Sequence, residues 1–317
     1  MEPRRVGVAV ITGIGGWRAQ DVRTTAREAE EHGFDAIFTT EANSDTMTTA
    51  QVMGCATSRI QVGTWIANIY LRHPFTCAKG AELIADDTGG RFILGLGFSH
   101  RPWNDALGID MSNAAEDLPR YVRAVRSWLA GEGSNTYLPH GPAPVRVPVY
   151  VAALSMAAVE RAAVIADGIM ATMWPPERVA QAAEAIERGR ARAPGLGDLD
   201  VTVGLPTFLG DDLDALHDAA RGYLGAYTTF PFYQRLWRES GFDVEVDRME
   251  QGVGPAALSD RMLDSFCLIG PVSRCRERLA AYREAGVDMP ILTPGIGPAA
   301  ALDVIRAFEP APQPSRR

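Results

Sequence analysis

Lysine is almost missing from this sequence. Of the 31 Lys and Arg residues in the 317-residue chain, Lys79 is the single lysine, and arginine supplies the rest. Schiff-base aldolase chemistry needs a desolvated lysine at the end of a strand. Lys79 instead falls inside a predicted helix, with Glu82 nearby. We therefore exclude that chemistry.

Cysteine motifs and basic tracts are missing as well. The four cysteines are Cys55, Cys77, Cys267 and Cys275, and they form no C-x-x-C pair and no metal-ligand spacing. We expect reduced, buried thiols and no metal site. The formal net charge is −8, with acidic and basic residues interspersed. This charge pattern argues against nucleic-acid and anionic-membrane partners and favours a small-molecule substrate.

Long apolar runs are also absent. Residues 1–13 carry two arginines and a short apolar run, which glycine interrupts well before the length of a signal peptide or a membrane span. We expect this segment to hold the first strand of a cytoplasmic protein that does not enter a membrane.

The sequence does contain a regular alternation of strand-length apolar runs with helical periods. This alternation is typical of βα units around a parallel sheet. Eight strands are predicted, at residues 6–11, 36–39, 60–67, 92–97, 149–153, 168–173, 201–209 and 290–293. From this alternation we predict an α/β fold. The hydrophobic content of 46% is enough to fill one large core. The predicted fold is a (β/α)8 TIM barrel that forms a single domain over residues 1–309.

Two stretches interrupt the alternation and are predicted insertions, at about residues 132–147 and 211–264. Residues 310–317 are rich in proline and are expected to form a flexible tail. The second insertion is far more aromatic than the 8% of the whole chain, with Tyr223, Tyr227, Phe230, Phe232, Tyr233, Trp237 and Phe242. It is either a small helical core or dimer contact, or a lid over an apolar substrate pocket.

A barrel of this kind carries its chemistry at the carboxyl ends of the strands. The residues predicted there are Glu41, Asn68, Ser99, His100, Leu154, Ser155 and Trp174. Glu41 and His100 are the acid/base pair among them, and an imidazole changes protonation near neutral pH. Both have an equally weighted structural alternative, in which His100 is a hydrogen-bonded structural histidine and Glu41 accepts hydrogen bonds from loop amides.

A turn after the fifth predicted strand is a second candidate binding element. The stretch "VPVYVAALSMAAVERAA" places small residues and a serine between a strand and a helix that opens near Ser155. Free amides at the start of a helix can bind an anion, although many such helices carry no ligand.

Five stretches, in order and nearly end to end, resemble the bacterial luciferase-like flavin and deazaflavin oxidoreductases, and within them the F420-dependent branch. They are "AEEHGFDAIFTTE", "IQVGTWIANIYLRHP", "GGRFILGLGFSHRP", "VPVYVAALSMAAVERAAVIADG" and "FCLIGPVSRCRERLAAYREAGVDMPILTP". The resemblance implies a luciferase-like barrel that binds F420, with FMN as the alternative cofactor.

The resemblance also implies roles for particular residues. Glu41 would lie beside the reactive ring, and His100 close to its reacting edge. A strand bulge with a non-prolyl cis peptide between Trp65 and Ile66 would back the ring. The implied cofactor-binding set is Glu41, Trp65, Ile66, Asn68, and the phosphate-binding turn Ala153, Leu154, Ser155 and Met156. Arg72 and Arg101 are candidates to meet an acidic cofactor tail.

The implied activity is an F420H2-dependent oxidoreductase that moves a hydride between C5 of the deazaflavin and a C=C, C=N or carbonyl group. The family's sugar-phosphate dehydrogenases clamp the substrate phosphate with lysines, which this chain lacks outside Lys79. Four aromatic residues favour a bulkier, less charged substrate: Trp103, Trp174, Phe230 and Trp237. Two alternatives stay open, an FMN-dependent monooxygenase that uses O₂ and a non-catalytic flavin-binding barrel. Because such barrels often pair, a homodimer is open too.

Overall fold

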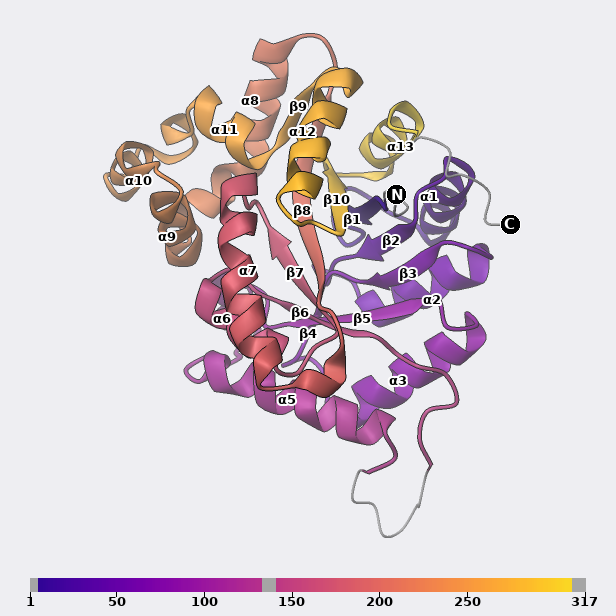
Figure 1. Cartoon of the computed structure of the whole chain (residues 1–317). Helices are drawn as coiled ribbons and strands as arrows, with labels where there is room; N and C mark the ends of the chain where they lie inside the picture. Colours follow the sequence, from indigo (N-terminus) through magenta and orange to yellow (C-terminus); the bar gives the residue numbers. More distant parts are fainter. Residues whose placement is uncertain (1–4, 133–140, 310–317) are drawn as a thin grey trace.

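The computed structural model describes residues 5–132 and 141–309 (Figure 1). Eight parallel strands form a closed barrel: β1 (Gly7–Val10), β2 (Ala36–Thr39), β3 (Gln61–Thr64), β5 (Phe92–Gly97), β6 (Val149–Ala152), β7 (Gly168–Thr172), β8 (Asp200–Leu209) and β10 (Met289–Pro294). The barrel closes because β10 pairs with both β8 and β1. The predicted (β/α)8 barrel and its eight strands are confirmed.

Two short strands extend this frame. β4 (Ala67–Asn68) pairs with the end of β5, and β9 (Leu268–Gly270) pairs with the end of β8. The third predicted strand, residues 60–67, is therefore divided into β3 and β4. The peptide bond between Trp65 and Ile66, which lies between these two strands, is cis, as the family resemblance implies.

Each barrel strand buries side chains on two faces, which is why the strands read as continuous apolar runs. Along β1, for example, Ala9 faces a small cluster inside the barrel. Val8 and Val10 instead face the larger layer between the sheet and the surrounding helices. The inner cluster ends at Trp65 and Ile66, which are only partly buried. The barrel interior is thus filled below these two residues and open above them.

Helices surround the barrel, as Figure 1 shows. The outer ring consists of α1 (Ala19–Glu31), α2 (Thr46–Ala56), α3 (Pro74–Asp87), α5 (Ala114–Leu129), α6 (Met156–Ala163), α7 (Pro176–Ala191), α12 (Val272–Glu284) and α13 (Pro298–Ala307). A short helix, α4 (Arg101–Ala106), lies between β5 and α5, and a 3-10 turn, η1 (Pro194–Leu196), follows α7. Among the described residues, no helix is long and apolar enough to cross a membrane.

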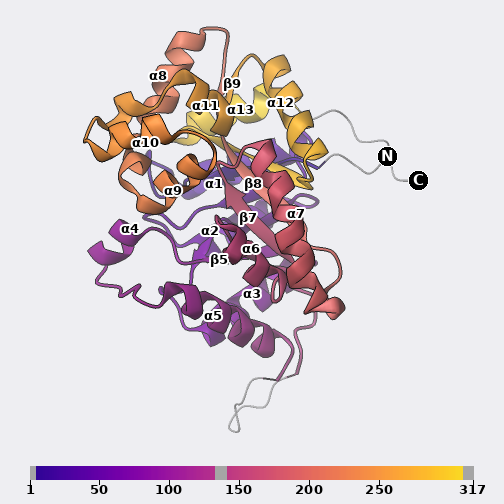
Figure 2. The same cartoon turned by 60° about the vertical axis from the view of Figure 1, so that its left-hand side comes forward.

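Helices also make up the segment between β8 and β9, where the second insertion is predicted. They are α8 (Leu213–Leu224), η2 (Gly225–Thr229), α9 (Pro231–Glu239), α10 (Asp243–Glu250), η3 (Gly254–Ala257) and α11 (Asp260–Phe266). Figure 2 shows α9 and α4 facing each other on the same side of the barrel. Of the first predicted insertion, residues 133–140 lie outside the described residues, as does the predicted tail at residues 310–317.

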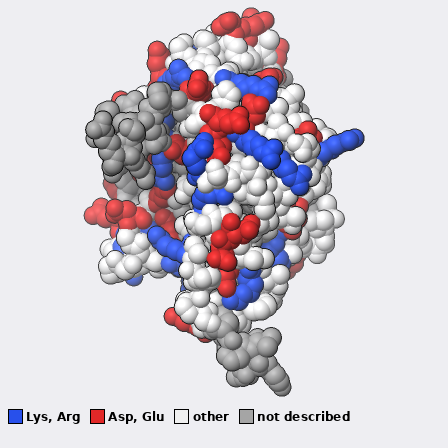
Figure 3. All heavy atoms as spheres, turned by 90° about the vertical axis from the view of Figure 1, so that its right-hand side faces the viewer, with Lys and Arg blue, Asp and Glu red and all other residues white. Residues whose placement is uncertain are grey.

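The structure also shows how charge is distributed on the surface and which cysteines are buried. Figure 3 shows acidic and basic side chains interspersed on the face that it presents. Cys77, Cys267 and Cys275 are buried and reduced, as expected. Cys55 is also reduced but exposed. The expectation of burial is wrong for Cys55 because it lies near the end of α2, on the side away from the sheet.

Candidate active site

A cavity of about 880 Å³ opens at the carboxyl ends of the barrel strands. Its volume falls in the range of about 300 to 1,000 Å³ that is typical of small-molecule sites. The barrel contributes Glu41, Trp65, Ile66, His100, Leu154 and Ser155, together with apolar neighbours. The insertion contributes Tyr223, Tyr227, Phe230, Phe232, Tyr233 and Leu236. The insertion therefore supplies one wall of the cavity.

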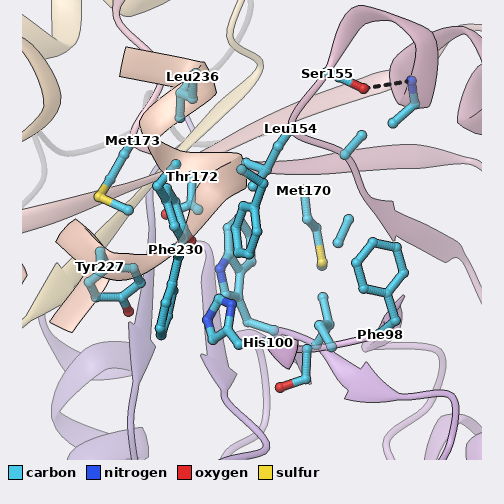
Figure 4. Close-up of a pocket in the computed structure, with 18 of the residues that line it drawn as sticks. Phe98, His100, Leu154, Ser155, Met170, Thr172, Met173, Tyr227, Phe230 and Leu236 are labelled. Carbon is cyan, nitrogen blue, oxygen red and sulfur yellow. Dashed lines mark hydrogen bonds between the residues drawn. The ribbon is translucent and has the colours of Figure 1, made fainter. Parts of the chain in front are cut away.

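His100 reaches this cavity from the loop between β5 and α4. The preceding residue, Ser99, has a positive φ of 58°, which turns the chain sharply after the strand. Figure 4 shows the His100 ring beside Phe230 on one side of the cavity, with Phe98 and Met170 on the other side. The ring nitrogen Nδ1 is buried and has no hydrogen-bond partner in the described part of the chain. No hydrogen bond at this nitrogen therefore fixes the ring to the rest of the described chain.

Burial also sets the charge of His100. Desolvation lowers the pKa of His100 from 6.5 to about 4, and no neighbouring charge contributes to the shift. The imidazole is therefore neutral at physiological pH, with one ring nitrogen that donates and one that accepts a hydrogen bond.

Glu41, in contrast, is fully engaged by the protein. Its side chain is buried, and its two oxygens accept hydrogen bonds from both terminal nitrogens of Arg72. They also accept from the amide of Asn68 at 2.6 Å and, more weakly, from the amide of Thr46 at 3.4 Å. Burial alone would lower the pKa of Arg72, but the hydrogen bonds and charge of Glu41 raise it above its usual range. The two residues form a buried ion pair.

The Glu41 and Arg72 pair fixes the chain just beyond the bulge. Asn68, whose amide Glu41 holds, follows the Trp65–Ile66 bond by two residues. Trp65 packs edge-on against Phe38, with 5.5 Å between ring centroids. Trp65 and Ile66 line the cavity at the open end of the barrel interior. Glu41 thus controls the position of the segment that forms the floor of the cavity.

The side chain of Asn68 turns away from the cavity. Its Nδ2 donates to Oδ1 of Asn104 at 2.8 Å, and its Oδ1 accepts from the amide of Tyr70. Asn104, which is fully buried, donates in turn to the carbonyl oxygen of Phe98 at 2.6 Å. This chain of hydrogen bonds connects β4 to the loop that carries His100. Asn68 therefore does not line the cavity, although the resemblance places it among the cofactor-binding residues.

The predicted phosphate-binding turn borders the same cavity. Ala153, Leu154 and Ser155 line it, whereas Met156 does not. Ser155 caps α6, because its Oγ accepts from the amide of Ala158 at 3.2 Å, the contact drawn in Figure 4. The amides of Leu154, Ser155 and Met156 donate to no acceptor among the described residues. Free amides at the positive end of a helix are suited to an anion.

A buried arginine connects this turn to the insertion. Arg178 donates to the carbonyl oxygen of Leu154 at 2.9 Å and to Glu239 of α9 at 2.8 Å. Its guanidinium also lies over the Trp174 ring, 5.5 Å from the centroid. No motif in the sequence indicates Arg178, since its partners come from segments far apart along the chain.

Of the four predicted substrate-pocket residues, Trp103 and Phe230 line the cavity, but Trp174 and Trp237 do not. Both of these rings are fully buried. Trp174 lies under Arg178, because Met173, with a φ of 52°, turns the chain and takes the cavity position instead. Trp237 packs against Phe266, on a face of α9 next to the one that lines the cavity.

The predicted contacts for an acidic cofactor tail also differ. Arg72 is committed to Glu41 and Asp45, and Arg101 donates to the carbonyl oxygen of Met111. Two other arginines line the cavity with exposed side chains, Arg161 of α6 and Arg235 of α9. Neither forms an ion pair within residues 5–132 and 141–309. No cluster of metal-ligating side chains occurs in that part of the chain either.

The fold and the cavity define a (β/α)8-barrel protein with a cavity at the carboxyl ends of its strands. The sequence profile of the luciferase-like monooxygenase family matches residues 5–289. The chain belongs to this family.

Similar proteins include oxidoreductases, and the names of some of them mention coenzyme F420. A putative coenzyme F420-dependent oxidoreductase of Mycobacterium tuberculosis is 26% identical, over 89% of this chain and 94% of the relative. The 5,10-methylenetetrahydromethanopterin reductase of Methanolobus tindarius is also 26% identical, over 86% of this chain and 90% of the relative. The solved coenzyme F420-dependent tetrahydromethanopterin reductase of Methanopyrus kandleri has a TM-score of 0.74 at 20% identity, covering 96% of this chain and 97% of that one. This structural likeness supports the fold.

Proposed function

We propose that this chain is an F420-dependent oxidoreductase acting on a small, apolar organic substrate. The observation that carries the proposal is a single cavity that joins three features: the free amides before α6, the Trp65–Ile66 segment, and the neutral His100. The relative named as a putative coenzyme F420-dependent oxidoreductase supports the choice of cofactor.

The residues present fit this cofactor. The free amides of Leu154 and Ser155 in the cavity wall, with the amide of Met156 next to them at the start of α6, would hold its phosphate. Trp65 and Ile66 would support one face of its ring. When bound, F420 supplies or accepts a hydride at C5 of its deazaflavin ring. The contribution of the protein is to orient the substrate, to exclude water and to manage the proton.

His100 is the residue proposed to manage that proton. Reduction of a C=C, C=N or carbonyl group adds a hydride at carbon and a proton at the other atom. The neutral imidazole first takes up a proton from solvent, and the imidazolium then donates this proton to a substrate oxygen, nitrogen or carbon and returns to the neutral form. In the oxidative direction the same residue accepts the proton.

Glu41 receives a different role from the one the resemblance implies. A general acid or base needs a free lone pair or proton, whereas the oxygens of Glu41 already accept from Arg72 and from two amides. We assign Glu41 as a positioning residue that holds the chain beyond Trp65 and Ile66. Its predicted catalytic role is the alternative that this assignment replaces.

A second candidate function is an FMN-dependent monooxygenase, which the name of the matching family favours. The free amides before α6 suit the phosphate of FMN as well as that of F420. A non-catalytic flavin-binding barrel is the third alternative. It would require that substitution of both Glu41 and His100 leaves every activity intact. A homodimer and a cytoplasmic location stay predictions.

A pair of fluorescence titrations tests the proposal. The purified protein is titrated with F420 and, separately, with FMN. Preference for F420 by about tenfold or more supports the oxidoreductase, since tenfold corresponds to about 1.4 kcal/mol of binding free energy. Preference for FMN would move the assignment to the monooxygenase, and binding of neither would contradict any cofactor role for the turn before α6.

A further inference from the structure

The surroundings of His100 carry information about the substrate itself. Four aromatic rings of the insertion surround its imidazole, and all of them line the cavity. The distances between ring centroids are 5.8 Å to Tyr227, 5.3 Å to Phe230, 5.7 Å to Phe232 and 6.0 Å to Tyr233. We call these four residues the aromatic box. The group proposed to handle the proton is therefore reached through a chamber whose wall is made of rings.

The aromatic box carries no charge. Burial raises the pKa of Tyr227 and Tyr233, so both hydroxyls stay neutral. The shift at His100 comes from burial alone, which means that no charged side chain acts on the imidazole. A charged ligand placed here would lose its hydration without gaining a counterion, and that loss is costly.

The charged residues that line the cavity either form ion pairs with other side chains or are exposed at its rim. Glu41 is paired with Arg72, and Arg178 with Glu239. Arg161 and Arg235 are exposed at the rim. A charged end of a ligand could therefore lie only at the rim, away from His100.

The rings also select for shape. Aromatic rings have a negative face and a positive edge, and they attract other planar π systems through offset or edge-to-face contacts. Within the box, Phe230 and Phe232 lie with their planes 30° apart, and the plane of Phe232 is 11° from that of His100. His100 and Phe232 are thus nearly parallel, and Phe230 is tilted by 37° from His100. The faces that these rings present favour a flat ligand over a saturated ring of the same size.

We propose that the substrate is an uncharged, planar, conjugated carbonyl compound whose ring packs in the aromatic box and whose oxygen accepts a hydrogen bond from His100. This inference rests on the proposed function for the role of the site in redox chemistry. It goes beyond that function by specifying flatness and lack of charge at the reacting end of the substrate.

Three ketones of similar size test the inference by calorimetry or saturation-transfer NMR, with the protein alone and with F420 bound. Acetophenone is flat and uncharged, cyclohexyl methyl ketone is uncharged but not flat, and para-acetylbenzoate is flat but charged. We expect acetophenone to bind about tenfold tighter than the other two. Equal binding of either competitor, or absence of acetophenone binding, would overturn the inference.

Matched variants of the insertion show whether the box is responsible. Phe230→Leu should weaken acetophenone binding about three- to tenfold, as expected for loss of an aromatic contact, and should leave cyclohexyl methyl ketone unaffected. Phe242→Leu is the control, because Phe242 is buried in the same insertion but does not line the cavity. An equal effect of both variants would indicate general loosening of the insertion and contradict the proposal.

The outcomes separate this inference from the proposed function. If F420 binds but the three ketones bind alike, the substrate class is wrong and the cofactor assignment stands. A second outcome is that F420 does not bind, acetophenone is preferred, and Phe230→Leu weakens acetophenone binding. The proposed function then fails, and the inference about the aromatic box stands.

Discussion

The imidazole of His100 combines three properties that are uncommon in one residue: it is neutral, mostly buried, and unpartnered at Nδ1. In the unfolded chain a histidine titrates near its ordinary pKa of 6.5, whereas in the folded protein it titrates near 4. The unfolded state therefore binds the proton first as the pH falls. The stabilisation that this shift provides is complete above pH 6.5 and is lost between about 6.5 and 4.

The first prediction follows from this linkage. Because one pKa unit corresponds to about 1.4 kcal/mol, the loss between pH 6.5 and 4 is at most about 3.5 kcal/mol. His100→Phe, which keeps a ring in the aromatic box, should show a flatter dependence of unfolding free energy on pH over that window. Urea unfolding at a series of pH values measures it, with His32→Gln, outside the cavity, as the control. Parallel curves for wild type and His100→Phe would refute the burial argument.

A second prediction concerns turnover. His100→Ala and His100→Gln should lower kcat by about 10²-fold or more, while the affinity for F420 changes little, because a general acid acts on the reacting substrate. Steady-state kinetics and a cofactor titration of the same preparations separate the two effects. Unchanged turnover would return His100 to a structural role.

A third prediction tests Glu41 as a positioning residue. Glu41→Gln removes the buried partner of Arg72 and leaves it paired with the more exposed Asp45, which should destabilise the fold by about 1.5 to 3 kcal/mol. It should also weaken F420 binding, with kcat at saturating cofactor close to wild type. Removing both charges in Glu41→Gln with Arg72→Met should recover much of the stability. A loss of kcat with stability and affinity intact would instead favour a direct catalytic role.

Single residues differ in how far the sequence alone could reveal them. Glu41 and His100 are found by asking which acid/base side chains follow predicted strands. Asn104 and Arg178 are not, because their roles depend on partners such as Phe98 and Glu239 that reach them only in the fold. Trp174 shows a further limit, since a one-residue turn at Met173 decides which side chain enters the cavity.

At the scale of elements, the turn into α6 carries the cofactor assignment. Met156 is the first residue of this helix, and Ser155 before it has an extended backbone, with φ −105° and ψ 154°. Proline is accepted at such a position, where it removes one free amide and leaves the helix intact. The contribution of that amide to anion binding can thus be measured alone.

The fourth prediction uses this substitution. Met156→Pro should weaken F420 binding by about tenfold or more, since a hydrogen bond to a charged group contributes about 1.5 to 3 kcal/mol. Binding of the dephosphorylated deazaflavin should be unaffected. The matched control is Asp260→Pro, at the first position of α11, where Ser259 is also extended. Equal weakening of both ligands would show that the turn does not hold the phosphate.

Elements were predictable where one physical signal dominates. The barrel strands are apolar on both faces and read clearly from the sequence, and helices such as α5 follow from their 3.6-residue period. No comparable pattern in the sequence marks the division of the third strand into β3 and β4. This division was anticipated only through the resemblance of "GTWIAN" to the family.

At the scale of the whole molecule, the cavity belongs to two parts of the chain. The barrel supplies the floor and the proposed phosphate turn, and the insertion supplies the aromatic box. Arg178 links the two through Leu154 and Glu239. Both sequence-based interpretations of the insertion describe part of it: Trp237, Phe242 and Phe266 form its own core, and the aromatic box faces the cavity. Composition could not divide these rings between the two sets, because the division depends on the three-dimensional path of the chain.

One measurement tests the central claim most directly. The protein is loaded with reduced F420 without air and mixed in a stopped-flow instrument, either with a panel of aryl ketones or with oxygenated buffer. Reappearance of oxidised F420 absorbance reports the transfer. The account predicts reoxidation that depends on a ketone and yields one alcohol per cofactor, with no oxidation by oxygen on the same timescale. Rapid oxidation by oxygen with no transfer to any ketone would contradict it.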